Sequence, residues 1–475
     1  MKAILFRTLV FTHRYVGIAI GWLMLLWCLS GLVMLYVSYP ELKEAERYTA
    51  LNTVDVAQCC NVPQSLFPAD MPIATVAVEM LVDRPVLRVH LDFGPSAFID
   101  LRTGNAIGSI AQDTVLAAAH QHLPAGNTAT PQILGLISRD QWTVYSRYNN
   151  DRPLHHLALR DAAGTQVYVS SVDGRVVQKT TRMQRFWNWL GAVPHWLYFT
   201  AIRENVALWN NLVIYSALLG GFLTVFGLLL GVWQLRRKFD NQLHSPYRGW
   251  KYWHHVPGLV FGVLVLTWVV SGLLSMKPWG LLKSEGYGPE AWHLRGELPT
   301  WQGVQASLQR LSSANLPANA VHVESSIVQG QLHYLVSTRA GARIRYDAHW
   351  QIAPMTESLQ QHLAQQLGGK AELLHSEDAY WYSNVHAPVA LPVIRVIAAD
   401  NTRYYLDSVS GELLSKFDAG ARGYRWLHLG LHRMDFAAVL RTRPLRDVLM
   451  WVLLLGASTV CLTGVWMGVT RLRRR

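Results

Sequence analysis

Four long apolar segments interrupt an otherwise mixed sequence, and none of them contains an Asp, Glu, Lys or Arg. They cover residues 16–40, 205–235, 254–276 and 448–470. Each exceeds the roughly 20 apolar residues that cross the hydrocarbon core as a helix, so the pattern predicts four transmembrane helices. The first segment is also longer than the apolar part of a signal peptide, about 7–15 residues. We therefore expect it to be an uncleaved membrane anchor.

The stretches between these segments differ in length and in charge. Residues 41–204 and 277–447 are long enough for folded domains. Residues 1–15, 236–253 and 471–475 are short and hold 12 Lys or Arg and one Asp, in a chain whose net charge is +12. Basic residues concentrate in cytoplasmic loops, so we expect cytoplasmic termini and two periplasmic domains. Nucleic acid is not an expected partner, because the positive charge flanks the membrane.

The two halves of the sequence repeat one pattern of His, Gly, Ser and Trp. At a spacing of 241 residues, His13 matches His254, Gly17 matches Gly258, Gly21 matches Gly262, Trp27 matches Trp268, Ser30 matches Ser271 and Gly31 matches Gly272. Trp189, His195 and Phe199 recur at a spacing of 237, and Gly231 matches Gly464 at 233. Parallel repeats are related by an axis along the membrane normal. We therefore expect an internal duplication of a helix–domain–helix unit.

A shorter repeat occurs within the two long hydrophilic stretches. The copies are residues 98–105, 168–175, 405–412 and, without the Gly, 344–351. Each places an Asp at the end of an apolar run and, in three copies, a Gly before the next run. Gly supplies the positive φ of a tight turn, so each copy predicts an antiparallel hairpin. Helical patterns at residues 112–123 and 357–367 complete the picture of α+β domains.

These features resemble a known family of membrane proteins. The hairpin pattern resembles the PepSY domain, and the four membrane segments resemble the PepSY-associated transmembrane family. The motifs are His-x-x-x-Gly at residues 13–17 and 254–258, and Ser-Gly at residues 30–31 and 271–272. The resemblance covers essentially the whole chain. It implies an integral α-helical membrane protein with two periplasmic PepSY-like domains, in a family that includes iron-regulated inner-membrane proteins and ferric-siderophore reductases of Gram-negative bacteria.

Four histidines at matched positions are candidate axial ligands of haem b. The duplication pairs His13 with His254 at the cytoplasmic mouth, and His195 with His432 at the periplasmic mouth. An axis along the membrane normal brings each pair face to face, and a haem between two imidazoles has both axial positions filled. We therefore expect two haems. The alternative ligands are His255, His428 and His386.

Other residues of the membrane segments allow two interpretations. Glycines at matched positions let a flat ring approach the helices or let the helices pack directly; these are Gly17, Gly21, Gly258 and Gly262. Trp27 and Trp268, matched at mid-span, fit core packing or an electron path between haems. Cys59 and Cys60 are expected to be incidental thiols, with a disulfide or a metal site as alternatives.

Aromatic and basic residues near His195 and His432 form a candidate substrate surface. They belong to the aromatic belt that anchors helices at the headgroup level, or to a shallow site for an anionic ferric chelate between the two domains. The members of this surface are Trp196, Trp426, Arg203 and Arg425.

The resemblance implies a ferric-siderophore, or other ferric-chelate, reductase of the bacterial inner membrane, whereas the spacing of the histidines does not by itself specify a substrate. Electrons would enter at the cytoplasmic mouth and reduce the chelate at the periplasmic mouth. The cytoplasmic stretches are too short for a βαβ nucleotide-binding unit, so the electron donor would be another reductase, a reduced flavin or a quinol. Two alternatives need no cofactor: a PepSY assembly or regulatory factor, and a transporter accessory. The four segments lack the ionisable residues of a proton-coupled carrier, apart from His at their ends.

Overall fold

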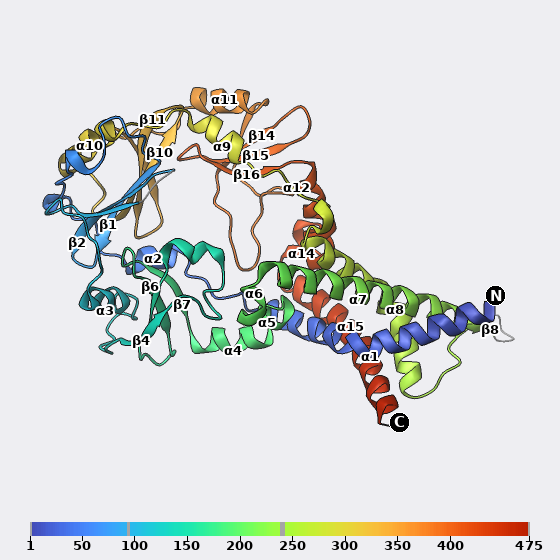
Figure 1. Cartoon of the computed structure of the whole chain (residues 1–475). Helices are drawn as coiled ribbons and strands as arrows, with labels where there is room; N and C mark the ends of the chain where they lie inside the picture. The colour runs from blue at the N-terminus through green and yellow to red at the C-terminus, as the bar shows by residue number, and fades with distance from the viewer. Residues whose placement is uncertain (1, 93–95, 238–242, 474–475) are drawn as a thin grey trace.

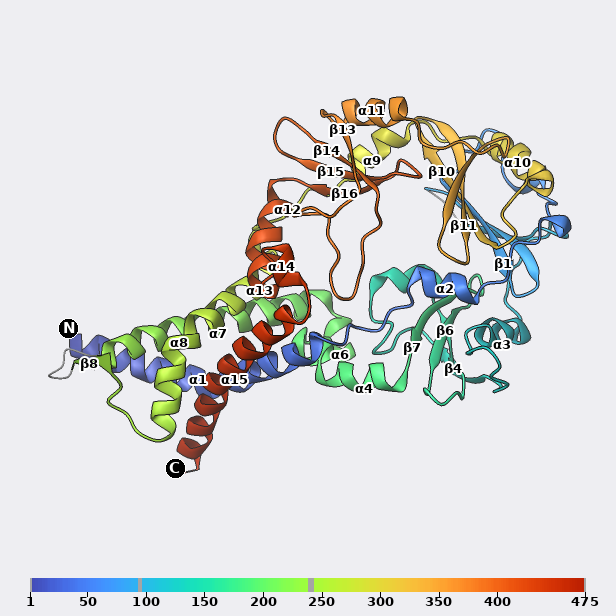
Figure 2. The same cartoon turned by 180° about the vertical axis from the view of Figure 1, so that it is seen from behind.

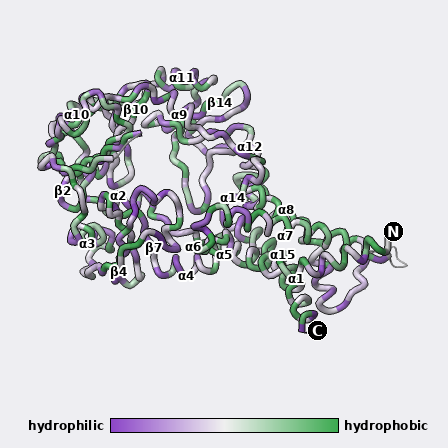
Figure 3. The backbone as a smooth tube through the Cα atoms, viewed as in Figure 1, coloured by the Kyte–Doolittle hydropathy of each residue, from purple (hydrophilic) through white to green (hydrophobic). Residues whose placement is uncertain are grey.

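The structure is a computed structural model that describes residues 2–92, 96–237 and 243–473. Four helices are long and apolar enough to cross a membrane: α1 (Lys2–Met34), α7 (Val206–Gln234), α8 (Trp250–Ser275) and α15 (Leu445–Leu472). Hydrophobic residues follow these helices along their length (Figure 3). The four predicted segments are confirmed as candidate membrane spans, and the chain is a multi-pass membrane protein.

The first helix differs from the predicted segment at both ends. It begins at Lys2, well before residue 16, and it ends at Met34. The apolar residues that follow leave the helix and enter a core outside the bundle. Tyr39 packs there against Trp142, and its hydroxyl donates to the carbonyl of Gln141. The apolar run extends beyond the C-terminal end of the helix because its last residues pack in this second core.

The four long helices form a bundle in the cyclic order α1, α7, α8, α15, with each helix packed along two neighbours. α1 therefore lies across the bundle from α8. Met24, Val265 and Leu454 are among the buried core residues, whereas Phe222 and Val260 face outward, as lipid-exposed side chains do. All sheets with four or more strands lie at one end of the bundle, the domain end, and the chain termini lie at the other, the terminal end (Figures 1 and 2).

A six-stranded antiparallel sheet combines strands from both extramembrane stretches. Its order is β12, β11, β10, β1, β2, β3, so three strands of each half meet where Glu79 on β1 pairs with His322 on β10. Trp301, on α10 (Trp301–Gln309), packs with Leu87 and Val336 in its core. The strands are β1 (Thr75–Leu81), β2 (Arg84–His90), β3 (Ala97–Asp100), β10 (Ala320–Val328), β11 (Gln331–Thr338) and β12 (Arg343–Asp347).

The sequence predicted one domain in each stretch, at residues 41–204 and 277–447, and in the structure the two stretches share this sheet. The two stretches are joined by backbone pairing between β1 and β10. Such pairing depends on two strand edges meeting in space, and a local pattern of apolar residues specifies only that each strand exists.

Each stretch also has a four-stranded antiparallel sheet of its own. α3 (Gln112–His120) places Val115 and Ala119 against the first, and α11 (Glu357–Gln366) places Leu363 against the second, as the helical patterns predicted. The sheets run in chain order: β4 (Gln132–Ile137), β5 (Leu154–Ala158), β6 (Gln166–Ser170), β7 (Val176–Thr180); and β13 (Ala371–Leu374), β14 (Val393–Ile397), β15 (Arg403–Asp407), β16 (Leu413–Phe417).

The predicted hairpin turns are confirmed. Gly104, Gly174 and Gly411 have φ values of 75°, 72° and 82°, which non-glycine residues rarely adopt. In the copy without a glycine, Asp347 accepts backbone hydrogen bonds from His349 and Gln351, and Trp350 takes the left-handed conformation with φ of 64°. The aspartate therefore closes this turn even where the glycine is missing.

Short helices connect the sheets to the bundle at the domain end. α5 packs against α1, and α13 packs against α8, which carries His195 and His432 into the end of the bundle. The connecting helices are α4 (Arg182–Leu190), α5 (Ala192–His195) and α6 (Thr200–Arg203) before α7, and α12 (Ala419–Tyr424), the π-helix η6 (Arg425–Gly430), α13 (Leu431–Arg433) and α14 (Ala438–Arg441) before α15. The remaining elements include α9 (Gly288–Arg295) and the two short strands β8 (Arg236–Arg237) and β9 (Leu243–His244) at the terminal end.

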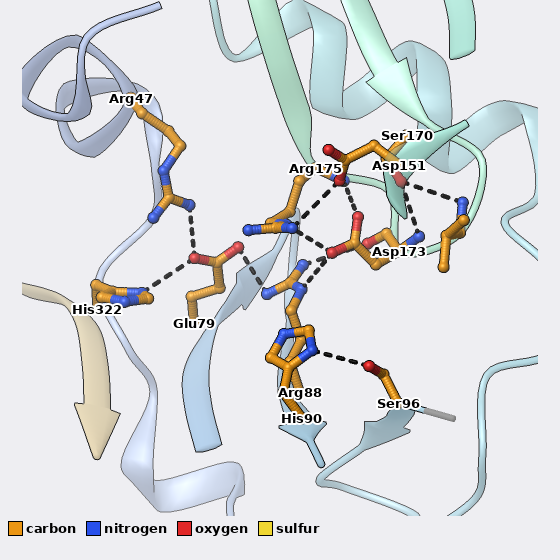
Figure 4. Close-up of polar contacts among 11 residues, drawn as sticks. Arg47, Glu79, Arg88, His90, Ser96, Asp151, Ser170, Asp173, Arg175 and His322 are labelled. Atoms are coloured by element: carbon orange, nitrogen blue, oxygen red, sulfur yellow. Dashed lines mark hydrogen bonds and ion pairs between the residues drawn. The ribbon is translucent and has the colours of Figure 1, made fainter. Parts of the chain in front are cut away.

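A buried cluster of charged side chains joins α2 (Glu44–Ala50) to the middle of the six-stranded sheet and to the β6–β7 turn (Figure 4). Glu79 is 2% exposed and accepts from Arg47 Nη1 at 2.7 Å and from His322 Nδ1 at 3.1 Å. Arg88 bridges Glu79 and Asp173, at 2.7 and 2.8 Å. Burial raises the pKa of Glu79, but Arg88, Arg47 and His322 outweigh burial and hold it well below its usual value. The ionised carboxylate thus neutralises buried cations.

Candidate functional site

The terminal-end histidine pair consists of His13 on α1 and His254 on α8. Their ring centres are 6.1 Å apart across the bundle, and the ring planes are inclined by 46°. Each Nδ1 faces a backbone carbonyl of the neighbouring helix: Leu223 O at 3.0 Å for His13, and Val460 O at 3.1 Å for His254. The two halves of the chain thus hold the two rings by equivalent contacts.

The domain-end pair repeats this arrangement with His195 of α5 and His432 of α13. The ring centres are again 6.1 Å apart, with the planes inclined by 69°. Nδ1 of His195 lies 3.1 Å from Ser30 Oγ, and Nδ1 of His432 lies 3.1 Å from Ser271 Oγ. Nδ1 of His195 also lies 3.2 Å from the carbonyl of Trp27. The structure therefore brings together both pairs that the sequence predicted.

These contacts fix which ring nitrogen is free. A carbonyl can only accept a hydrogen bond, so Nδ1 carries the proton and Nε2 keeps its lone pair in His13, His254 and His195. Nδ1 of His432 bonds Ser271, which matches the Ser30 partner of His195. Within the described residues, no hydrogen-bond partner lies at Nε2 of any of the four. Metal–imidazole bonds are about 2 Å long and a ring nitrogen lies about 1 Å from its ring centre, so two imidazoles on one metal have centres roughly 6 Å apart. The observed spacing fits a shared metal.

Glycines provide the space in which each ring lies. A Cβ on Gly227 would lie 2.7 Å from Cε1 of His13, and one on Gly464 would lie 3.2 Å from Cε1 of His254. At the domain end, Gly31 and Gly272 lie next to His195 and His432 in the same manner, with Cβ distances of 3.7 and 3.5 Å. Larger side chains at the first two positions would displace the rings.

The alternative ligands are placed differently. His255 has no free nitrogen, because Nδ1 lies 2.8 Å from Ser245 Oγ and Nε2 lies 2.8 Å from the carbonyl of Gly231. His428 bonds the carbonyl of Ser271 through Nδ1 and packs beside His432. His386 Nε2 lies 3.3 Å from the carbonyl of Met34. Across the described ranges, none of the three faces a matched histidine as the four paired rings do.

The glycines of the repeated motifs lie in helix–helix contacts. Gly17 and Gly258 face Leu223 and Val460, and Gly262 faces Leu228, with positions for a Cβ between 2.7 and 3.9 Å from these side chains. This arrangement favours the packing interpretation. The indole nitrogens of Trp27 and Trp268 are buried without a hydrogen-bond partner.

The candidate substrate surface needs a correction at Arg425. Its side chain is 1% exposed and pairs with Asp435 at 2.8 Å, so it cannot receive a chelate. Arg203 stacks on Trp209, with the guanidinium carbon 4.5 Å from the ring centre. Trp196 packs against Tyr39 and Tyr198, and the Trp426 indole donates to Tyr380 Oη. These three residues remain partly exposed at the domain end.

The cysteines of the first extramembrane stretch are not free thiols. Cys59 and Cys60 form a disulfide, and they pack against the core of the six-stranded sheet. Cys28 and Cys461 are buried as free thiols in the membrane bundle. Among the residues that the structure describes, no three or more His, Cys, Asp or Glu side chains gather as a metal site.

The family model for the PepSY-associated TM region matches residues 11–471 of the sequence. The chain belongs to this family. The match contains both histidine pairs, all of α7 and α8 and most of α1 and α15, and it confirms the predicted resemblance over essentially the whole chain. A search of curated proteins finds no match.

Sequence reasoning missed one feature of this PepSY-associated TM protein. It aligned Gly231 with Gly464, whereas the contacts equate Gly227 with Gly464, because these two glycines face His13 and His254. The spacing is then 237, as for His195 and His432, and Leu223 and Val460, whose carbonyls face the two rings, have the same spacing. Extending the spacing of 237 through the second and fourth membrane segments would have matched Gly227 with Gly464 and Leu223 with Val460.

Proposed function

We propose that the chain is a diheme b-type electron-transfer protein that passes electrons across the membrane to a ferric chelate. The observation that supports this most is the pair of facing histidines at each end of the bundle, with equal spacing between ring centres. Haem b, when bound, supplies a one-electron Fe(III)/Fe(II) couple whose axial ligands are protein side chains.

The residues of the chain fit that cofactor. His13, His254, His195 and His432 would hold the two irons through Nε2, and the hydrogen bonds at Nδ1 orient the rings, as partners of ligating histidines commonly do. The domain-end pair lies near Ser30 of α1 and the other pair contains His13 of the same helix, so about 25 Å of helix separates them.

Internal duplication accounts for this arrangement. The matched histidines make matched contacts in both halves, at spacings of 241 and 237 residues. The six-stranded sheet also has a symmetric order, with β1 and β10 at its centre. We infer that one helix–domain–helix unit was duplicated, and that the pseudo-two-fold axis runs between the paired rings.

The proposed location is the inner membrane of a Gram-negative bacterium, with cytoplasmic termini and periplasmic sheets. This orientation rests on the 12 basic residues in the short stretches. We expect a fluorescent protein that matures only in the cytoplasm to be active when fused after Arg475. Alkaline phosphatase, which needs the periplasm, should be inactive there and active when inserted after Gly341, in an exposed turn of the second extramembrane stretch. The opposite pattern would reverse the proposed direction of electron flow.

The proposed substrate is a ferric siderophore or a comparable ferric chelate, as the family resemblance implies. Reduction would release iron, because Fe(II) binds hard oxygen donors less tightly than Fe(III). The described parts of the three short stretches contain no nucleotide-binding unit, so the donor would be a separate reductase, a reduced flavin or a quinol.

The competing proposal is a PepSY assembly or regulatory factor, or a transporter accessory, without a cofactor. The absorption spectrum of the purified protein distinguishes the two. We expect a b-type spectrum that sharpens on dithionite reduction, with two haems per chain by pyridine haemochrome, and reoxidation by ferric chelate. Protein expressed with added haem precursor that shows no haem bands would contradict the electron-transfer proposal.

A further inference from the structure

Basic side chains gather at the domain end of the bundle, beside His432. Arg433 follows that histidine directly, Arg443 lies just before α15, and Arg446 lies in the first turn of that helix. His386, on the long β13–β14 connection, and Lys43 complete the group, because the Lys43 ammonium donates to the His386 carbonyl at 2.8 Å. We call Lys43, His386, Arg433, Arg443 and Arg446 the mouth cluster.

The mouth cluster is not neutralised by its neighbours. Arg433 and Arg443 both lie within electrostatic range of Arg446. Asp447 is shared between two of these arginines, at 3.4 Å from Arg443 Nε and 3.9 Å from Arg446 Nη1. Asp435, the other nearby acid, is already paired with the buried Arg425. Arg443 and Arg446 therefore share one carboxylate, and within the described residues Lys43 and Arg433 have no ion pair.

Several donors of this region make no hydrogen bond. Arg446 Nη1 is buried without one, and its ion-pair contact is Asp447 at 3.9 Å. Nε and Nη1 of Arg441 are also without a hydrogen bond, and Nη1 lies 3.8 Å from Glu377. Arg433 is exposed and, within the described residues, has no hydrogen bond or ion pair. Leaving a buried donor unpaired costs about 1–3 kcal/mol, and like charges add to that cost. An anion with several oxygen atoms would relieve both.

The positions of the first half that match these arginines hold aromatic side chains instead. At the spacing of 237 residues, Trp196 matches Arg433 and Trp209 matches Arg446. The Trp209 indole nitrogen donates to the Trp196 carbonyl at 2.8 Å, and Arg203 stacks on Trp209. These two matched positions are therefore aromatic in the first half of the chain and basic in the second, so the repeat departs from symmetry near the domain-end histidine pair.

We propose that the mouth cluster is an anion site that binds the ionised oxygen donors of a ferric chelate and holds its iron next to the domain-end histidine pair. The proposal rests on the proposed function and specifies its substrate: a chelate with net negative charge, such as a ferric carboxylate complex. A neutral or cationic chelate gains nothing from Arg433 and Arg446.

The test compares Arg433→Gln, Arg446→Gln and the double variant, as full-length protein in lipid nanodiscs. Ferric citrate should reoxidise the dithionite-reduced double variant at least about tenfold more slowly than the wild type at low ionic strength, whereas cationic ferrioxamine B should react at the wild-type rate. Arg310→Gln, an exposed arginine of the six-stranded sheet region, serves as the charge-matched control and should change neither rate.

Binding of redox-inert gallium citrate, measured by equilibrium dialysis, separates this proposal from the proposed function, because it needs no haem. Weaker binding in both single variants supports the anion site even if no electron transfer is found. Unchanged gallium citrate binding in the double variant overturns it. Loss of haem, or equal slowing with both iron chelates, also overturns it, since the arginines would then serve the cofactor.

Discussion

Purified His13→Ala and His254→Ala variants are expected to contain about half of the wild-type haem, and so are His195→Ala and His432→Ala. Each pair would hold one iron through two Nε2 atoms, so the loss of either ring removes one haem. Combining one change from each pair should remove nearly all haem. Pyridine haemochrome per mole of protein is the measurement, and full haem in all four single variants would contradict the ligand assignment.

Glycine variants extend this test to the space around the rings. In Gly464→Ala the new Cβ would lie 3.2 Å from Cε1 of His254, and in Gly227→Ala it would lie 2.7 Å from Cε1 of His13. Both should weaken haem binding at the terminal end, and Gly227→Ala should have the larger effect. Gly221→Ala is the matched control, because no atom lies within 4 Å of its added Cβ.

Other histidines provide a second set of controls. His428→Ala and His386→Ala should keep two haems, because neither ring faces a partner ring across the bundle in the way that the two pairs do. A loss of haem in His428→Ala comparable to that in His432→Ala would instead place His428 among the ligands.

Glu79→Gln should destabilise the extramembrane sheets by about 3–5 kcal/mol, the usual cost of removing one partner from a buried ion pair. Arg47 and Arg88 would keep their charges in the sheet interior without the carboxylate that neutralises them. Thermal unfolding followed by limited proteolysis in detergent measures the change. Glu324→Gln is the control: its side chain is 48% exposed beside the same His322, so it should cost no more than about 1 kcal/mol.

The same carboxylate gives the stability a dependence on pH. The folded pKa of Glu79 is well below its ordinary value of 4.5, so its contribution is present above that pH and is lost as the pH falls toward the folded pKa. Acid should therefore destabilise the wild type more steeply than Glu79→Gln. Equal slopes for both proteins would show that Glu79 is not the group that titrates.

The sequence predicted the elements better than their assembly. Long uncharged segments specify membrane helices because a bilayer admits few alternatives, and the Asp and Gly of each hairpin turn encode its geometry directly. The apolar residues 35–40 were wrongly included in the first membrane segment, because Tyr39 packs in a core outside the bundle and not against lipid. The β1–β10 pairing had no local signal at all.

For the candidate site, the repeat supplied what single residues could not. His13 and His254 are unremarkable alone, and their matched positions predicted that they face each other. The backbone carbonyls that accept from Nδ1 could not be predicted, because every residue has a carbonyl and the sequence does not mark which one lies near the ring. Arg425 was assigned to the surface for its position near His432, but its burial depends on Asp435, ten residues later in a turn that the sequence pattern does not define.

The sheet shared by the two halves has a consequence for biosynthesis. β1 finds its partner β10 only after α7 and α8 have been made and inserted, because both helices lie between Leu81 and Ala320 in the chain. Until then a nascent chain presents the unpaired edge of β1, and exposed edges pair readily with other strands. Glu79 places a charge on this edge strand, beside Arg47 of α2 and Arg88 of β2, and an ionised side chain on an edge strand discourages such pairing until His322 arrives.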